Sequence, residues 1–461
     1  MFRKLLFFLF ALLSLGLSAQ TFSYPAAEFT RARQILMFTP GDELFDGVIH
    51  PAAALYENYF DVDEAAKEHL NYIEMLRNNG IEVLRVQDVL QDMSIRDLRT
   101  LADPAFVYDA ENVTSISQDS VSWYHYDILT AMSRSDLIRC ILRRPKVVLS
   151  ETSQNTGMQA YYIHEPLMNM YFLRDQSITT PKGHIMCRMN STQRAPEVDI
   201  IEACYKHLEQ DAVYRIKGDD SYLEGGDYIP MGTFAFMGQG LRTTPAAISE
   251  ILVNDVLGLD TLVVVHDNWK DQYQMHLDTY FNVIDHDLAT LCFNRYDATD
   301  SSDPNFLTIT MYARQPGTTD YHSVSAYNNM GFKDFLASRG INVIRISKED
   351  ADHYANNFLA IDARHIMSVA NQSDELAATY AKYGVQVEWV PLENLICGYG
   401  AAHCMTQVLQ RDAYVAPVPE GVGSLQSTTV PSTAPAYTTA GLPATSNYRG
   451  VVITDDGKQL Q

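Results

Sequence analysis

The feature that most limits what this chain can fold into is the alternation of short apolar runs with amphipathic helical segments. Residues 34–38 form an apolar run typical of a buried strand. Residues 63–78 then carry apolar side chains spaced for one helical face, at Ala65, Leu70, Ile73 and Leu76. Residues 81–86 alternate in the manner of a second strand. Strand–helix–strand units of this kind predict an α/β fold.

The same pattern returns along the chain at irregular spacing and without sequence repetition. Further strands are predicted at 146–150, 185–189, 228–237, 262–266 and 341–344, and further helices at 197–208, 245–257 and 330–339. Recurring units of one type predict a large α/β domain over residues 20–415.

Two stretches depart from this pattern. Residues 87–145 contain helical patterns in succession, which predicts an inserted helical subdomain. Residues 416–445 are rich in Pro, Ser, Thr, Ala and Gly, a composition that cannot bury a core. We therefore expect the C-terminal stretch 416–461 to be a flexible tail.

The first 19 residues have the layout of a secretory signal peptide. Arg3 and Lys4 precede an apolar run over residues 5–17, and small residues follow it. The run is short for a membrane span, which needs about 20 apolar residues. We expect cleavage near Ala19 and export of a periplasmic or secreted protein without stable membrane insertion.

The charge of the chain bears on its partners. The net charge is −23, and the sequence has no long basic run. A surface of this sign repels phosphate backbones, which argues against nucleic acid as a partner. Long-range steering favours cationic small molecules instead. The sequence leaves the oligomeric state open, a homo-oligomer included.

A loop of small residues, 397–406, contains a candidate nucleophile. Small side chains let the backbone approach a ligand closely, and Cys404 lies at the end of this loop. The spacing of the six cysteines shows no compact disulfide framework. A single cysteine is more often a buried apolar side chain than a nucleophile, and Cys397 is near enough in sequence to be an oxidation partner. Cys404 is a candidate only together with other polar groups.

Three further polar clusters supply such groups. The first ends at Arg174 and Asp175, and the second places two carboxylates around a pair of glycines in residues 224–227. In the third, His276 and Asp278 are two residues apart and on an extended chain point to one face. Each cluster also has a plain structural interpretation, as a charged turn, an acidic turn or a solvated loop.

A metal site is another interpretation of the third cluster. Asp285, His286 and Asp287 follow it closely in sequence. Carboxylate and imidazole ligands suit several ions, so the spacing selects none of them.

Carboxylates, a histidine and a thiol together suit attack on a planar guanidinium. Carboxylates bind guanidinium nitrogens in bidentate fashion. A thiolate can attack the central carbon while histidine delivers a proton to the departing amine. The pattern therefore favours a small guanidino compound as substrate.

Four motifs, in order along the chain, resemble those of arginine deiminase, a member of the guanidino-group-modifying superfamily: residues 169–175, 224–227, 276–279 and 403–406. The resemblance covers residues 30–415. It implies a five-bladed α/β propeller of ββαβ units, with the site at the central axis and no metal or organic cofactor. It also implies hydrolysis of L-arginine to citrulline and ammonia, a step of arginine catabolism, through a covalent thiouronium intermediate.

The resemblance implies a role for each motif residue. Cys404 would be the nucleophile, and His276 the proton donor and later the base for water. Asp175 and Asp278 would hold the guanidinium, and Glu224 would orient His276. The implied substrate-binding residues are Asn169, Phe172, Asp175, Asp227, Arg194, Arg242, Asp278 and Tyr399.

Arg194 and Arg242 match the positions that hold the substrate's α-carboxylate in this family. For each, a surface ion pair is the structural alternative.

The last loop departs from the family pattern. Arginine deiminases usually carry an arginine shortly before the glycine-rich turn, whereas this stretch contains the uncharged Tyr399. Ala401 and Ala402 stand where glycines are usual. These differences argue against free L-arginine as the substrate more than they argue against a reaction on some guanidino compound. The alternatives are an amidinotransferase, a hydrolase for another guanidino compound, or an exported protein that binds a guanidino compound or a metal without turnover.

Overall fold

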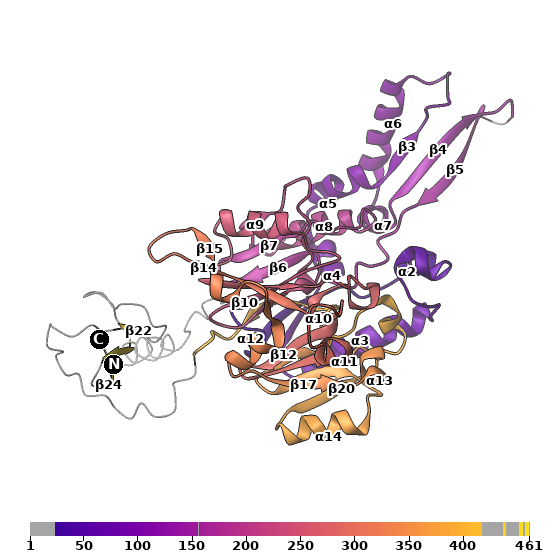
Figure 1. Cartoon of the computed structure of the whole chain (residues 1–461). Coiled ribbons are helices and arrows are strands. Elements are labelled where there is room, and N and C mark those ends of the chain that lie inside the picture. Colours follow the sequence, from indigo (N-terminus) through magenta and orange to yellow (C-terminus); the bar gives the residue numbers. More distant parts are fainter. Residues whose placement is uncertain (1–23, 155, 417–436, 439–450, 455–456, 461) are drawn as a thin grey trace, which may run out of the picture. The chain divides into compact units, whose positions relative to one another are not determined.

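The computed structural model describes residues 24–154, 156–416, 437–438, 451–454 and 457–460 (Figure 1). The chain divides into two compact units, the first ending at Tyr414 and the second beginning at Val415. The predicted signal peptide, residues 1–19, lies outside the described residues. Within the described ranges, no helix combines the length and the apolar character that a membrane span requires.

Five sheets of the first unit share one three-stranded topology. In each, two strands pair antiparallel, and a third strand, reached through at least one helix, pairs in parallel with the second. One sheet combines the two ends of the unit: β21 (Gln407–Arg411), β1 (Ala32–Met37), α3 (Val62–Asn78) and β2 (Glu82–Arg85). The second sheet and its helix are β6 (Ser177–Thr180), β7 (Gly183–Met186), α8 (Ala195–His207) and β8 (Tyr214–Arg215). The third are β9 (Tyr228–Pro230), β10 (Ala235–Gln239), α9 (Pro245–Val253) and β11 (Thr261–His266). The last two are β12 (Phe281–Asp285), β13 (Leu288–Cys292), α12 (Phe332–Ser338), β17 (Asn342–Ile346), and β18 (Leu359–Asp362), β19 (His365–Val369), α14 (Asp374–Lys382), β20 (Gln386–Val390).

The other elements of the first unit extend or connect these sheets. Strand β14 (Thr308–Arg314) pairs with β11, β15 (Tyr321–Ser323) and β16 (Met330–Gly331). The short helices are α2 (Glu43–Val48), α10 (Leu277–Tyr280), α11 (Phe293–Asp297) and α13 (Lys348–Asp352). Short 3₁₀ turns include η3 (Gly225–Asp227) and η6 (Leu395–Gly398).

Pairing of β1 with β21 joins the two ends of the first unit. Ile35 lies opposite Val408 in the antiparallel register. Every residue of β7, β12 and β13 is buried, which is typical of strands covered on both faces of a sheet. The predicted α/β fold with recurring strand–helix–strand units is confirmed.

Helix α3 illustrates how one unit forms locally. The Asp61 carboxylate accepts the Glu64 N–H at 3.0 Å and caps the start of the helix. Its buried face consists of Ala65, His69, Tyr72, Ile73 and Leu76. The prediction that Leu70 belongs to this face is wrong, and Leu70 is 45% exposed. Five residues beyond Ala65 correspond to about 140° around the helix, which turns Leu70 away from the sheet.

The segment between the first two sheets differs from the predicted helical insertion. It contains the helices α4 (Val86–Asp92), α5 (Ile95–Ala102), α6 (Gln118–Ala131) and α7 (Arg134–Arg143). It also contains β3 (Val107–Asp109), which pairs in parallel with β4 (Pro145–Glu151), and β4 pairs antiparallel with β5 (Met158–His164). The insertion is therefore mixed, because β3 finds its partner in a hairpin beyond the predicted boundary at residue 145 (Figure 1).

In the second unit, β22 (Tyr437–Thr438), β23 (Val451–Thr454) and β24 (Gly457–Leu460) form an antiparallel sheet. These strands lie within the stretch predicted to be a flexible tail, 416–461. Two of them fall beyond the Pro/Ser/Thr-rich residues 416–445, where β-branched residues return.

Removing the charge of Arg411 should destabilise the first unit. The buried guanidinium donates to the Glu28 carboxylate at 2.8 Å and to the carbonyl oxygens of Thr30 and Ala360. Arg411→Met leaves Glu28 buried with less compensation, and we expect the free energy of unfolding to fall by about 3–5 kcal/mol. Denaturant unfolding followed by circular dichroism measures this change.

Arg33→Met is the matched control for this experiment. Arg33 pairs with Asp412 at 2.7 Å, but both side chains are largely exposed. We expect the free energy of unfolding to change by less than about 1 kcal/mol. Equal destabilisation by the two variants would contradict the argument from burial.

Candidate active site

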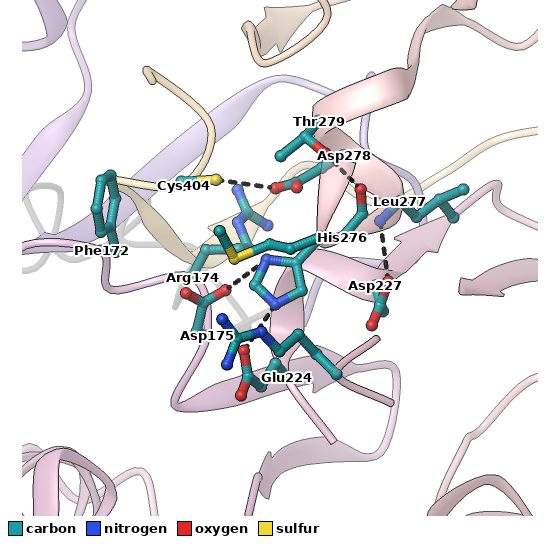
Figure 2. A network of polar contacts seen from close by, with 12 residues as sticks. Phe172, Arg174, Asp175, Glu224, Asp227, His276, Leu277, Asp278, Thr279 and Cys404 are labelled. Atoms are coloured by element: carbon teal, nitrogen blue, oxygen red, sulfur yellow. Dashed lines mark hydrogen bonds and ion pairs between the residues drawn. The ribbon is translucent and has the colours of Figure 1, made fainter. Parts of the chain in front are cut away.

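The predicted site residues lie in equivalent places of the repeated topology. Each precedes the first strand of one sheet: Asp175 before β6, Glu224 before β9, His276 and Asp278 before β12, and Cys404 before β21. Asn357 occupies the same place before β18. Segments far apart in sequence therefore contribute side chains to one location, where Asp175, Glu224, His276, Asp278 and Cys404 lie together (Figure 2) and Asn357 contacts the Cys404 backbone.

A pocket of about 20 Å³ lies between these segments. Its lining residues are Leu55, Asn169, Phe172, Asp175, Arg194, Arg242, Met275, His276, Gly398, Tyr399 and Cys404. Eight of the predicted site residues thus line one pocket. The other three, Glu224, Asp227 and Asp278, are buried but are not among the lining residues.

Cys404 is fixed at the end of its loop by a buried amide. The Asn357 Oδ1 accepts the N–H of Ala401 at 2.8 Å and the N–H of Cys404 at 3.1 Å. The Cys404 Sγ donates to Asp278 Oδ2 at 3.4 Å. Burial raises the pKa of the Cys404 thiol well above its ordinary value, and the negative charges of Asp278 and Asp175 add to this effect. The resting side chain is therefore a neutral thiol.

The thiol of Cys404 is not engaged in a disulfide. All six cysteines lie among the described residues, and each of them is free. The half-buried Cys397, named above as an oxidation partner, is therefore unpaired as well.

His276 lies between two carboxylates. Its Nε2 donates to Glu224 Oε2 at 2.7 Å, and its Nδ1 is 3.6 Å from Asp175 Oδ1 (Figure 2). Burial disfavours the imidazolium, but Asp175, Glu224 and Asp227 outweigh burial and raise the pKa of His276 to about 9. His276 in turn overcomes the burial of Glu224 and lowers the pKa of that carboxyl to about 2. At neutral pH the pocket therefore holds a protonated histidine.

Asp175 and Asp278 each keep one oxygen for a ligand. Asp175 Oδ2 accepts from Arg194 at 2.7 Å, and Asp278 Oδ2 accepts from His403 Nδ1 at 2.7 Å. The Oδ1 atom of each is buried and has no hydrogen-bond partner among the described residues. Buried polar atoms normally have a partner, so these two oxygens favour a ligand rich in N–H donors.

Arg194 is committed to the protein. Its guanidinium pairs with Asp175 at 2.7 Å and with Glu197 at 2.9 Å, both buried. It also donates to the carbonyl oxygens of Asn169 and Phe172. These contacts fix the pocket wall around Asp175, and they leave Arg194 poorly suited to hold a substrate carboxylate, contrary to the prediction from sequence.

Arg242 has donors to spare. It donates to Gln272 Oε1 at 3.3 Å, and its buried Nε has no hydrogen-bond partner among the described residues. Of the two arginines that line the pocket, Arg242 is therefore the one that fits the predicted contact with a carboxylate.

The remaining lining residues define the pocket walls. Asn169 donates to the carbonyl oxygen of Ala54 at 3.0 Å, so part of its amide is used within the protein. Tyr399 has a left-handed backbone conformation with φ of 67°, and its ring meets the Tyr273 ring edge-on, with the ring centres 5.1 Å apart. Phe172 packs against the loop that contains Cys404, next to Gly400.

Asp227 turns away from the pocket. Its Oδ1 accepts the Leu277 N–H at 2.9 Å, and its Oδ2 accepts the Thr243 hydroxyl at 2.6 Å. Burial raises the pKa of Asp227 to about 7. The prediction that Asp227 contacts substrate is not supported, because Oδ1 holds the backbone between His276 and Asp278 and Oδ2 is occupied by Thr243.

A buried row of charges behind Asp278 was not predicted. His403 Nε2 donates to Glu28 Oε1 at 3.2 Å. Glu28 also accepts from Arg411 at 2.8 Å and lies 3.6 Å from Arg174. Although burial opposes it, these cations lower the pKa of Glu28 well below its usual range. These groups place positive charge near the Asp278 carboxylate and so compensate its buried negative charge.

Only some of these groups had a signal in the sequence. His403 and Arg174 stand directly beside Cys404 and Asp175 in the motifs. Glu28 and Asn357 lie in stretches without a recognisable pattern, and only their contacts reveal them.

The clusters considered for metal binding are paired with charged side chains of the protein itself. Asp285 and Asp287 both pair with Arg364, at 3.0 and 2.6 Å, which neutralises much of their charge. Asp175, Glu224 and His276 bring ligand atoms within 4.8 Å of one another. Metal ligation by this cluster would require His276 to lose its proton, because a metal binds the neutral imidazole.

Without substrate, Cys404 should react slowly with iodoacetamide at pH 7, because its thiol pKa is raised and only the thiolate is nucleophilic. The rate should keep rising from pH 7 to pH 9 without a plateau. Asp278→Asn removes a negative charge next to the sulfur, and we expect alkylation about tenfold faster at pH 7, the effect of one pKa unit. Mass spectrometry of the Cys404 peptide gives the rate.

The exposed carboxylate of Asp63 provides the control for alkylation, and Asp63→Asn should leave the rate unchanged. A plateau below pH 7, or an Asp278→Asn rate equal to that of the control, would show that Cys404 is a thiolate at rest.

Comparisons with known proteins agree with this geometry. The sequence profile of the arginine deiminase family matches residues 53–411. Arginine deiminase of Halobacterium salinarum is 25% identical over 84% of this chain and 96% of its own length. For arginine deiminase of Lactococcus lactis subsp. lactis the identity is 24%, over 84% of this chain and 98% of the relative.

Among solved structures, the product-bound N-terminal domain of ArgZ, an arginine dihydrolase of Cyanobacteria, has a similar fold. The TM-score is 0.50 at 15% identity, over 82% of this chain and 97% of that chain. A family profile that spans most of the chain decides the assignment: the protein belongs to the arginine deiminase family.

Proposed function

We propose that the protein hydrolyses L-arginine to L-citrulline and ammonia, with Cys404 as the nucleophile. The observation that carries the proposal is the meeting of a thiol, an imidazolium and two unpaired carboxylate oxygens at one small pocket. Membership of the arginine deiminase family supports the same reaction.

Binding of the guanidinium is the first step. Its N–H groups satisfy the two buried Oδ1 atoms of Asp175 and Asp278, which have no hydrogen-bond partner among the described residues. The positive charge next to Cys404 offsets the two carboxylates that raise the thiol pKa. Substrate therefore promotes ionisation of the nucleophile, and the thiol proton passes to Asp278 Oδ2, 3.4 Å from the sulfur.

The thiolate then adds to the central carbon of the guanidinium and forms a neutral tetrahedral adduct. The His276 imidazolium transfers its Nδ1 proton to one nitrogen of this adduct, and the C–N bond breaks as ammonia leaves. A thiouronium cation remains on Cys404, and His276 is left neutral. Glu224, hydrogen-bonded to Nε2 at 2.7 Å, keeps the ring in the orientation that points Nδ1 into the pocket.

Hydrolysis reverses the roles. Neutral His276 takes a proton from water, and the resulting hydroxide adds to the thiouronium carbon. The C–S bond breaks and citrulline is released. The hydroxyl proton is lost to solvent as the carbonyl forms, and the Cys404 thiolate takes back its proton from Asp278, which restores the charged carboxylate. General acid–base catalysis of this kind contributes about 10²–10⁴-fold to the rate.

The distal end of the substrate meets Arg242 and Tyr399. Arg242 has free donors for an α-carboxylate, and Tyr399 contributes a hydroxyl without charge. One arginine with free donors is a weaker clamp than two, since Arg194 is held by Asp175 and Glu197. We therefore expect a higher KM for L-arginine than a site with two free arginines would give.

For the fold, we propose that the five ββαβ sheets close around an axis as a five-bladed propeller. Two observations support closure: β21 pairs with β1 across the ends of the unit, and equivalent segments of all five sheets meet at the pocket.

For localisation, we propose export after cleavage near Ala19. Support comes from the sequence alone, in the basic start and short apolar run of residues 1–19.

The catalytic proposal is tested by product formation. Under reducing conditions the mature protein should release ammonia and citrulline from L-arginine, and Cys404→Ala should release neither. His276→Gln should lower kcat by about 10²–10⁴-fold. The value of kcat/KM should decline as the pH rises through about 9, because His276 loses the proton that ammonia needs. Coupled ammonia assays and citrulline chromatography measure these rates.

Cys397→Ala is the matched control and should retain activity, since Cys397 lies outside the pocket lining. Turnover by Cys404→Ala at the rate of the unchanged protein would overturn the nucleophile. Turnover only in the presence of an added amine acceptor would favour the amidinotransferase alternative. Tight binding of arginine without turnover by the unchanged protein would favour the non-catalytic alternative.

The role of Arg242 has a separate test. Arg242→Gln removes a charged contact with the α-carboxylate, and such contacts contribute about 1.5–3 kcal/mol, so KM for L-arginine should rise about 10–100-fold with little change in kcat. Agmatine lacks this carboxylate, and its KM should change less than about threefold. Steady-state kinetics with both compounds measure the difference, and an equal rise for both would place Arg242 outside the clamp.

A further inference from the structure

A second cavity, of about 630 Å³, lies between the inserted segment and helix α8. Its walls come from α5, α7, the residues after β7, the start of α8, and β8 with the residues after it. It shares no lining residue with the Cys404 pocket. We call it the α8 cavity.

The charge of the α8 cavity is opposite to that of the chain. Its lining includes four basic residues, Arg144, Arg188, Arg215 and Lys217, and one acidic residue, Asp199. The chain as a whole has a net charge of −23. A concave site lined by one sign of charge concentrates counter-ions of the other sign, so this cavity attracts anions on an otherwise acidic protein.

Three of the four cations have no carboxylate partner within ion-pair distance among the described residues. Arg188 donates to the carbonyl oxygens of Gly218 and Asp219, which are neutral and leave its charge uncompensated. The Lys217 ammonium lies 5.6 Å from the centre of the Tyr214 ring. The third is Arg144; the fourth, Arg215, pairs with Asp199 and Glu202.

Arg144 is the least satisfied of these groups. Its guanidinium makes one long hydrogen bond, 3.4 Å, to the carbonyl oxygen of Pro104. Burial lowers the pKa of Arg144, and the charges of Glu165 and Asp199 do not offset the loss of water. An anion in the cavity would supply the missing charge, and the planar guanidinium groups of Arg144 and Arg188 match the geometry of phosphate oxygens.

Residues in the wall of the α8 cavity are direct sequence neighbours of residues that shape the Cys404 pocket. Ala195 and Pro196 line the cavity, while Arg194 and Glu197 on either side of them form the buried pair that holds Asp175. Residues of the first turn of helix α8 thus line the cavity, and Arg194, which directly precedes the helix, lines the Cys404 pocket.

A second connection runs through the residues after β7. Arg188 and Met189 line the cavity, and the next residue, Asn190, donates its N–H to Glu224 Oε1 at 2.9 Å. Glu224 is the partner of His276. A ligand that moves either wall therefore acts on the carboxylates that set the protonation of His276.

We propose that the α8 cavity binds a small phosphate-bearing anion and that its occupation is coupled to the Cys404 pocket. The anion is a molecule of a few phosphate groups rather than a nucleic acid, since the basic surface is confined to one cavity of a strongly acidic protein. Binding itself does not depend on the reaction at Cys404.

Inorganic pyrophosphate is a suitable probe of binding. Isothermal titration of the mature protein at low ionic strength should give one saturable site per chain. The double variant Arg144→Gln/Lys217→Gln should bind at least tenfold more weakly. The control Lys67→Gln/Lys348→Gln has the same change in net charge on exposed side chains elsewhere, and its affinity should change less than twofold.

Two results would overturn the binding site: no saturable binding to the unchanged protein, or equal weakening in the two double variants, which would indicate general attraction by surface charge. The Cys404→Ala variant should bind pyrophosphate as tightly as the unchanged protein. Failure of arginine hydrolysis would therefore leave this test intact.

Coupling is measured without substrate, through the alkylation of Cys404. Saturating pyrophosphate should change the iodoacetamide rate at Cys404 at least twofold, and the change should disappear in Arg144→Gln/Lys217→Gln. Sodium chloride at the same ionic strength corrects for salt effects on the reaction. Binding of pyrophosphate with an unaltered alkylation rate would refute the coupling.

Discussion

The structure depends on keeping several buried carboxylates charged around one pocket. Each has a basic partner from another part of the chain: Asp175 with Arg194, Glu224 with His276, Asp278 with His403, and Glu28 with Arg411. An uncompensated buried charge costs several kcal/mol, so removal of either partner of a pair destabilises the fold. Two of these pairs, Glu224 with His276 and Asp278 with His403, join segments of different sheets, so the charge network is complete only when those sheets have come together.

The repeated topology explains why the network meets at one point. The segment before the first strand of each sheet is short and buried, and side chains from five such segments converge. Space there is limited: a Cβ atom at Gly226 would lie 2.8 Å from His276 Nδ1 and 3.0 Å from Asp278 Oδ1. The paired glycines of residues 224–227 thus let His276 and Asp278 sit against the backbone that positions Glu224.

Sequence reasoning could predict the α/β class and motifs whose side chains meet at one pocket, because strand periodicity and motif order are local properties. It could not predict Glu28 and Asn357, whose importance comes only from contacts with His403 and Cys404, which are distant in sequence. It assigned Arg194 and Asp227 to substrate because charge is visible in a sequence and its partner is not. Leu70 was misplaced because its apolar character was counted toward the buried face, although its position about 140° around the helix from Ala65 turns it away from the sheet.

The raised pKa of Cys404 links binding to chemistry. In the resting pocket, burial and the negative charges of Asp278 and Asp175 keep the sulfur neutral. A neutral thiol resists oxidation, which matters for a cysteine whose loop also contains the half-buried Cys397. A neutral ligand would leave the negative potential of Asp175 and Asp278 at the sulfur unchanged. The positive charge of a guanidinium cancels this potential. In the proposed reaction, the same two carboxylates therefore protect the Cys404 nucleophile when the pocket is empty and select the cation that activates it.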